Sequence, residues 1–97
     1  VLGDMGELGD GAPQMHAEVG AAAREAGIDA LVALGELSAH AAAAFGEGAT
    51  RAASPEAAAT AARRDATPGT TILVKGSRFM RMERVVGLLM EEGARAA

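Results

Sequence analysis

Short apolar runs along the chain alternate with longer segments in which apolar residues recur at helical spacing. The runs are bounded by glycine or proline, a pattern typical of strands buried in a parallel sheet. They predict strands at residues 1–2, 31–34 and 72–74, and we expect a less regular strand at residues 50–53. The chain therefore contains four candidate strands.

The run at residues 72–74 is the one around which we expect the chain to be organised. It follows Pro68-Gly69 and precedes Gly76, so we predict a strand that is covered on both faces. Polar and charged residues follow at its exit: Lys75, Ser77 and Arg78. Ligands of open α/β sheets bind at this kind of edge, beyond the carboxyl ends of the strands.

Helical periodicity and capping residues predict helices at residues 13–26, 38–45, 55–64 and 80–93. The third has a good start, because Ser54 can cap its first turn and Pro55 fits its first position. Two stripes of residues are expected to face the core. They are Met15, Val19, Ala22 and Ala26 in the first helix, and Met82, Val85, Val86 and Leu89 in the last.

Strands and helices thus alternate along the chain. This order predicts a single α/β domain with a Rossmann-like three-layer α/β/α fold and a mostly parallel sheet. Because the first residues already have the character of a strand, we expect the chain to be cut from something longer, with the fold truncated at its N-terminal side.

The loops that follow the strands share one edge of such a sheet, and most residues with plausible site chemistry fall in them. Two cations and a hydroxyl group follow the last strand within four residues, a cluster that suits a carboxylate or phosphate. The opening loop carries carboxylates that form either an acid/base pair or a solvated surface. The candidates are Asp4, Glu7, Glu36, Ser38, Lys75, Ser77 and Arg78.

The amino-acid composition excludes several kinds of catalytic and metal-binding site. The chain has no cysteine, which excludes disulfides, thiolate zinc sites and thiol catalysis. His16 and His40 lack partners at metal-ligand spacing, so we expect no metal site and interpret both as packed or exposed histidines. The glycines at positions 3, 6 and 9 do not match the dinucleotide fingerprint, and residues 75–77 lack the upstream glycine of a phosphate loop.

The net charge and the hydropathy of the chain indicate which classes of partner to expect. The net charge is −4, without a long run of either sign, so we do not expect nucleic acid as a partner. The sequence contains no apolar run of about 20 residues, the length needed to cross a bilayer, so we expect no membrane insertion and a cytoplasmic location.

Two stretches together are specific enough to indicate a family. They are VLGDMGELG at residues 1–9, and ILVKGSR at residues 72–78 with Met82-Glu83 following. In this combination the chain resembles the C-terminal domain of the Mur ligases, over essentially its whole length. Residues 16–20, residues 26–29 and Leu34-Gly35 fit the same family in the same order.

The resemblance implies a three-domain enzyme of peptidoglycan synthesis, and specifically the branch that joins D-Ala-D-Ala to UDP-MurNAc-tripeptide. Such an enzyme uses ATP and Mg²⁺, which are bound mainly in its central ATPase domain and therefore mainly outside this chain. The chain would form part of the closing domain and would be inactive alone. The resemblance implies substrate-binding positions facing the central domain at Lys75, Ser77, Arg78, Asp4, Glu7 and Leu8.

Two other interpretations stay open at this point. One is a stand-alone α/β ligand-binding or receiver-like module that uses Asp4 and Lys75. A receiver would have paired acids near its first strand and a proline after its lysine, whereas Gly76 follows Lys75 here. The other is an interaction domain in which the glycine-rich loops are only turns.

Overall fold

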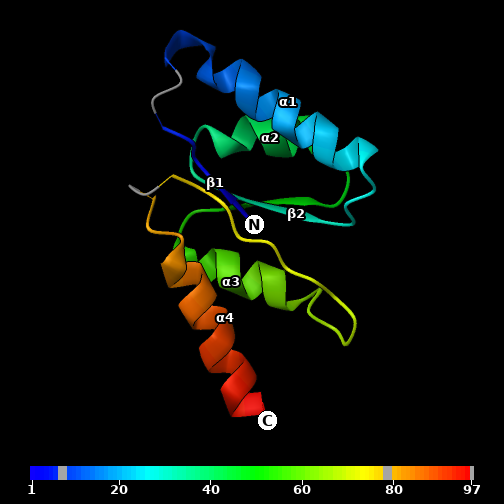
Figure 1. The fold of residues 1–97 in the computed structure, drawn as a ribbon, viewed down its shortest axis with the longest axis vertical. Coiled ribbons are helices and arrows are strands. Elements are labelled where there is room, and N and C mark those ends of the chain that lie inside the picture. The colour runs from blue at the N-terminus through cyan, green and yellow to red at the C-terminus, as the bar shows by residue number, and fades with distance from the viewer. Residues whose placement is uncertain (7–8, 78–79, 97) are drawn as a thin grey trace.

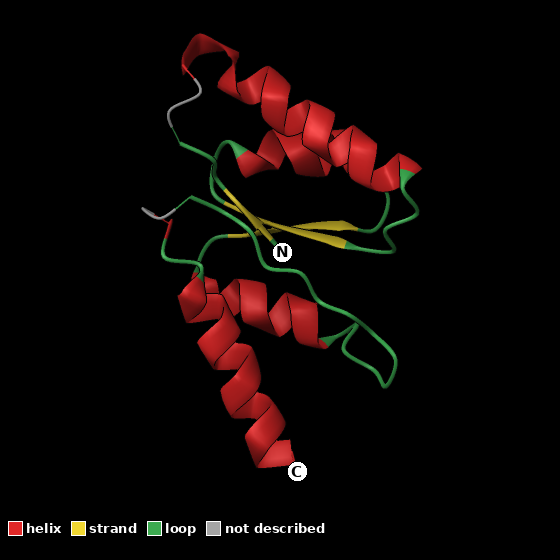
Figure 2. Ribbon diagram, in the orientation of Figure 1, coloured by secondary structure: helices red, strands yellow, loops and turns green. Residues whose placement is uncertain are grey.

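The computed structural model describes residues 1–6, 9–77 and 80–96, with side chains as far as residue 90. It has the predicted α/β fold (Figures 1 and 2). The strands β1 (Leu2–Gly3), β2 (Leu31–Leu34) and β3 (Ala49–Ala52) form a parallel sheet in the order β1-β2-β3. The helices are η1 (Gly9–Gly11, a 3-10 turn), α1 (Ala12–Glu25), α2 (Ser38–Phe45), α3 (Pro55–Arg63) and α4 (Glu83–Ala96).

Helices cover the sheet on both sides, which gives the three layers expected from the sequence. Figure 1 shows α1 and α2 above the sheet, and α3 and α4 below it. Because successive side chains of a strand point to opposite faces, β2 contributes to both cores. Leu31 packs with Phe45 of α2, whereas Val32 and Leu34 pack with the alanines of α3 and with Val85 of α4.

The fourth predicted strand differs from the expectation. Residues 72–74 run alongside β1 at the edge of the sheet, joined by one isolated bridge between Leu2 and Lys75. Val74 packs against the core next to α4, but Leu73 is 72% exposed, so the segment is not covered on both faces. The reason is its edge position beside a strand of two residues, which leaves little sheet to pair with.

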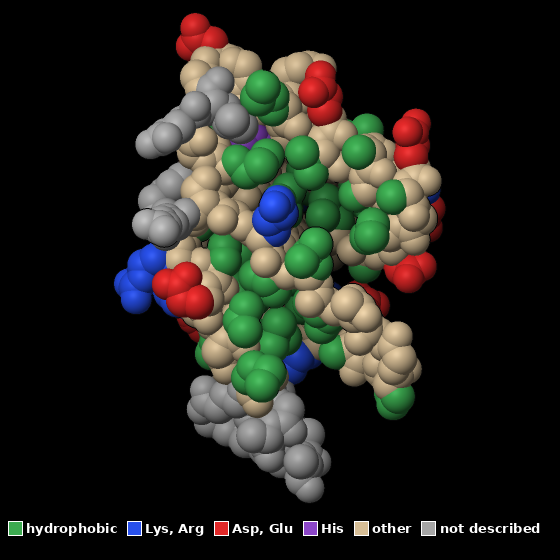
Figure 3. Space-filling view, viewed as in Figure 1, with side chains coloured by type: hydrophobic (Ala, Val, Ile, Leu, Met, Phe, Trp, Pro, Cys, Tyr) green, Lys and Arg blue, Asp and Glu red, His purple; other side chains and the backbone are tan. Residues whose placement is uncertain are grey.

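Three backbone contacts hold this edge segment to β1. Lys75 N–H donates to Val1 O at 2.9 Å, and Gly3 N–H donates to Lys75 O at 2.7 Å. The nitrogen of Val1 donates to Leu73 O at 2.7 Å. Apolar side chains gather on the face shown in Figure 3, and large apolar residues that remain exposed in the chain include Leu73, Val86 and Met90.

The predicted core stripe of the first helix is wrong. Met15 and Val19 are 45% and 37% exposed, and the buried residues of α1 are Ala12, His16 and Gly20. A hydrophobicity pattern misses this stripe because the helix is packed through small residues and a histidine. Where α1 packs on α2, a Cβ on Gly20 would collide with the backbone carbonyl of Ala41. In α4, by contrast, Met82 just before the helix and Val85 are buried as predicted, although Val86 is 43% exposed.

Candidate functional site

The opening loop and the exit of the edge segment lie side by side, as the sequence predicts for two loops that follow parallel strands. The backbone N–H of Gly6 donates to the hydroxyl oxygen of Ser77 at 2.6 Å. The backbone N–H of Ser77 donates in turn to Asp4 O at 3.1 Å. We call residues 4–6 together with residues 75–77 the paired edge.

Asp4 links the paired edge to α2. Its carboxylate accepts the backbone N–H of Ser38 at 2.7 Å and that of Leu37 at 3.2 Å, so it caps the positive end of α2 from another loop. Gly35 makes this possible. Its φ is +116°, and a Cβ there would collide with the carboxylate of Asp4. Asp4 is therefore a half-buried anchor and not a solvated loop carboxylate.

Ser38, another sequence candidate, lies at the start of α2 and is fully buried. Its backbone N–H binds Asp4, while its hydroxyl oxygen has no hydrogen-bond partner among the described residues. Ser38 therefore contributes to the position of Asp4 through its backbone.

Met82 packs against Gly3 and Gly76, next to the paired edge. A Cβ on Gly3 would lie 2.5 Å from the Met82 sulfur, and one on Gly76 would lie 2.7 Å from its Cγ. Neither glycine has a left-handed backbone, so glycine is needed at both positions for space and not for φ. The sequence identified Gly76 as a strand breaker, and the structure gives it a packing function as well.

The side chains of the paired edge differ in exposure. Lys75 is exposed and Ser77 is half-buried. Within the residues that the structure describes, Lys75 forms no ion pair, and the single ion pair found there joins Arg81 to Glu83. Three further sequence candidates, Glu7, Leu8 and Arg78, lie outside the described residues, so their roles stay predictions.

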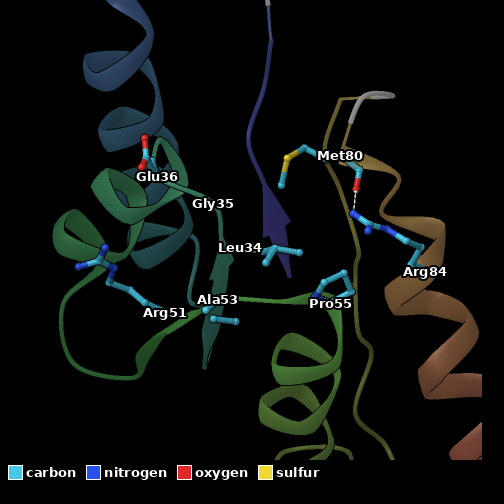
Figure 4. Close-up of a pocket in the computed structure, with 9 residues that line it drawn as sticks. Leu34, Gly35, Glu36, Arg51, Ala53, Pro55, Met80 and Arg84 are labelled. Carbon is cyan, nitrogen blue, oxygen red and sulfur yellow. Dashed lines mark hydrogen bonds between the residues drawn. The ribbon is translucent and has the colours of Figure 1, made fainter.

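A cavity of about 610 Å³ opens beyond the carboxyl ends of β2 and β3, at the end of the sheet where the paired edge also lies (Figure 4). The lining of this cavity includes Glu36, which is one of the candidate residues indicated by the sequence. Sequence reasoning missed Arg51 and Arg84, although an arginine near the end of a strand is the same signal that drew attention to Lys75. The lining residues are Leu34, Gly35, Glu36, Arg51, Ala52, Ala53, Pro55, Met80 and Arg84.

The two arginines of this cavity are not directed at a common point. Figure 4 shows the side chain of Arg51 extending away from Met80 and Arg84. Arg84 donates to Met80 O at 2.6 Å and to Arg81 O at 3.0 Å, so its guanidinium holds the turn before α4. The cavity therefore lacks the converging polar groups of a built site.

Comparison with known proteins identifies the family. Residues 1–78 match the family described as "Mur ligase, glutamate ligase domain". The chain belongs to the Mur ligase family. It is 41% identical over 95 aligned residues, with 96% of this chain covered, to the UDP-N-acetylmuramoyl-tripeptide--D-alanyl-D-alanine ligase of Escherichia coli strain K12. The chain spans 21% of that protein, about a fifth of its length.

The paired edge and seven of the nine residues that line the cavity lie within the part of the chain that matches the Mur ligase domain, so the family match does not choose between the two features. We take the paired edge as the candidate site because its polar groups are bonded to one another, whereas the two arginines of the cavity do not converge. None of the helices in the described part of the chain is long and apolar enough to cross a membrane.

Proposed function

We propose that this chain is part of the C-terminal domain of a cytoplasmic, ATP-dependent ligase that adds D-Ala-D-Ala to UDP-MurNAc-tripeptide in peptidoglycan synthesis. Family membership and the 41% identity to a ligase of that name support this proposal. The observation that carries it is the paired edge, because the hydrogen bond between Gly6 and Ser77 brings together the two stretches on which the resemblance depends.

In the proposed reaction, the terminal carboxylate of the tripeptide takes the γ-phosphoryl group of ATP to form an acyl phosphate, and ADP leaves. The amine of D-Ala-D-Ala then attacks the acyl carbon, an amide bond forms, phosphate leaves and the amine loses a proton. ATP and Mg²⁺ are assigned mainly to the central ATPase domain of the same polypeptide. This chain lacks a phosphate loop, and its described residues contain no cluster of three carboxylate or histidine groups.

The paired edge would bind and orient the dipeptide without taking part in bond making. The Ser77 oxygen accepts the N–H of Gly6, so its own O–H remains to donate to a carboxylate oxygen of the dipeptide. Lys75 would supply the opposite charge, which a carboxylate needs when a closing domain strips it of water. Asp4 would act by holding the loop, and Arg78, Glu7 and Leu8 are included in the proposed site by their positions next to these residues.

The same geometry argues against a receiver-like module. Such a module would need a free carboxylate near its first strand to accept a phosphoryl group. The oxygens of Asp4 are instead bonded to two backbone N–H groups of α2.

The test is the substitution Lys75→Ala in the full-length protein that carries this chain. It should raise the KM for D-Ala-D-Ala by about tenfold, the effect of losing roughly 1.4 kcal/mol of binding free energy, with a smaller change in kcat. Arg64→Ala is the matched control, because Arg64 is an exposed cation at the end of α3, at the opposite edge of the sheet. An unchanged KM for the dipeptide in Lys75→Ala would remove Lys75 from the site.

A further inference from the structure

We propose that His16 is a positioning residue for the paired edge, in that it fixes the backbone of Met5 and Gly6 and, through Gly6, the hydroxyl group of Ser77. This inference rests on the proposed role of Ser77 in binding the dipeptide. Neither the family match nor the name of the relative assigns a role to this histidine.

The bonds of His16 define its charge state. The side chain is completely buried on α1, and both ring nitrogens have partners. Nδ1 lies 2.6 Å from the carbonyl oxygen of Ala12, which can only accept, so Nδ1 carries the proton. Nε2 lies 3.0 Å from the backbone nitrogen of Met5, which can only donate, so Nε2 is unprotonated. The ring is therefore a neutral imidazole that bridges α1 and the opening loop.

The opening loop is held from three sides. His16 accepts the N–H of Met5, the carboxylate of Asp4 binds α2, and the N–H of Gly6 reaches Ser77. The N–H of Met5 and the carbonyl of Asp4 share one peptide plane, which is held by His16 at the N–H and by the backbone N–H of Ser77 at the carbonyl oxygen. The next peptide plane carries the N–H of Gly6, which donates to the Ser77 hydroxyl. Without an acceptor at Nε2, the first plane keeps only its bond to the Ser77 backbone, and the Gly6 N–H is held less firmly against the Ser77 hydroxyl.

A histidine suits position 16 because its side chain is long enough to join α1 to the opening loop. The acceptor has to extend from the buried side of α1 to the loop, while a second polar atom closer to Cβ bonds the carbonyl of the preceding turn. Glutamine places a polar atom about as far out as Nε2, whereas asparagine reaches only about as far as Nδ1. Comparing glutamine with asparagine at position 16 therefore distinguishes the loss of the bond to the loop from the loss of a polar side chain.

The experiment compares His16→Asn with His16→Gln in the full-length ligase, with His40→Asn on α2 as the control, because His40 is exposed. His16→Asn should raise the KM for D-Ala-D-Ala by about tenfold with kcat nearly unchanged, and His16→Gln should restore most of the loss. Deuterium exchange of the amides at positions 5 and 6 should be faster in His16→Asn, and near the unmodified rate in the other two variants.

A measurement on the unmodified protein covers the case in which His16→Asn does not fold. The Met5 amide should then exchange much more slowly than an unprotected amide, and exchange at the unprotected rate would overturn the inference. An equal KM and equal exchange in His16→Asn and His16→Gln would overturn it too. If Ser77→Ala leaves the dipeptide KM unchanged while the exchange results hold, the proposed function fails but the positioning of the loop stands.

Discussion

Gly6 and Ser77 are 71 residues apart in the chain, yet the backbone N–H of one donates to the hydroxyl oxygen of the other at 2.6 Å. A second bond, from Ser77 N–H to Asp4 O, runs in the opposite direction between the same two loops. Reciprocal bonds of this kind fix how the loops lie relative to each other. The loops therefore behave as one surface, and changes in either should affect the other.

The packing of α1 on α2 gives the sharpest stability prediction. Gly20→Ala should lower the free energy of unfolding by about 2 kcal/mol, because the new methyl group meets the backbone carbonyl of Ala41, which cannot rotate away. Gly87→Ala is the matched control. It lies within α4 with no atom within 4 Å of its added Cβ, so it should raise stability by about 0.5–1 kcal/mol. Urea denaturation measures both, and a shared sign would contradict the predicted packing.

The cap that Asp4 provides to α2 can be tested by removing its charge. Asp4→Asn keeps one oxygen but loses the negative charge at the helix N-terminus, and should cost about 1 kcal/mol of stability. Asp29→Asn serves as the control, because Asp29 is exposed in the loop before β2. Equal unfolding midpoints for the two variants would show that the cap contributes nothing.

The space that Met82 occupies beside the paired edge predicts coupling between two substitutions. Gly76→Ala alone should destabilise the chain by about 1–3 kcal/mol, because its Cβ would lie 2.7 Å from Met82 Cγ. In the Met82→Ala background the same substitution should cost clearly less, since the colliding side chain is gone. A double-mutant cycle of unfolding free energies measures the coupling, and additive effects would rule out this contact.

The sequence predicted the order of elements and the adjacency of the two loops because both follow from alternation alone. Once strands and helices alternate, the loops after the strands must meet at one edge of the sheet. The start of α3 was also predictable, because its cap is local: Ser54 accepts the N–H of Ala57 at 3.1 Å. The family was recognisable from two short motifs within the part of the chain that the family match covers.

The features that differ from the sequence-based expectations depend on contacts between elements, which the pattern of hydrophobic and polar residues does not encode. The stripe of Met15 and Val19 looked like a core face, but α1 turns Ala12, His16 and Gly20 inward because close packing on α2 requires small residues. Leu73 looked buried because it is apolar, yet its segment lies at the sheet edge. The functions of Asp4 and His16 rest on bonds to distant backbone groups, and no local sequence signal reports such bonds.

The proposed binding of the dipeptide at the paired edge is tested most directly by the KM for D-Ala-D-Ala of Ser77→Ala in the full-length ligase. Ser54→Ala is the control, because it also removes a serine acceptor of a backbone N–H, but at the start of α3. We predict that Ser77→Ala raises this KM by about tenfold, whereas Ser54→Ala leaves it unchanged and lowers stability by about 1 kcal/mol. Equal KM values for the unmodified enzyme and Ser77→Ala would show that the hydroxyl group of the paired edge does not bind the dipeptide.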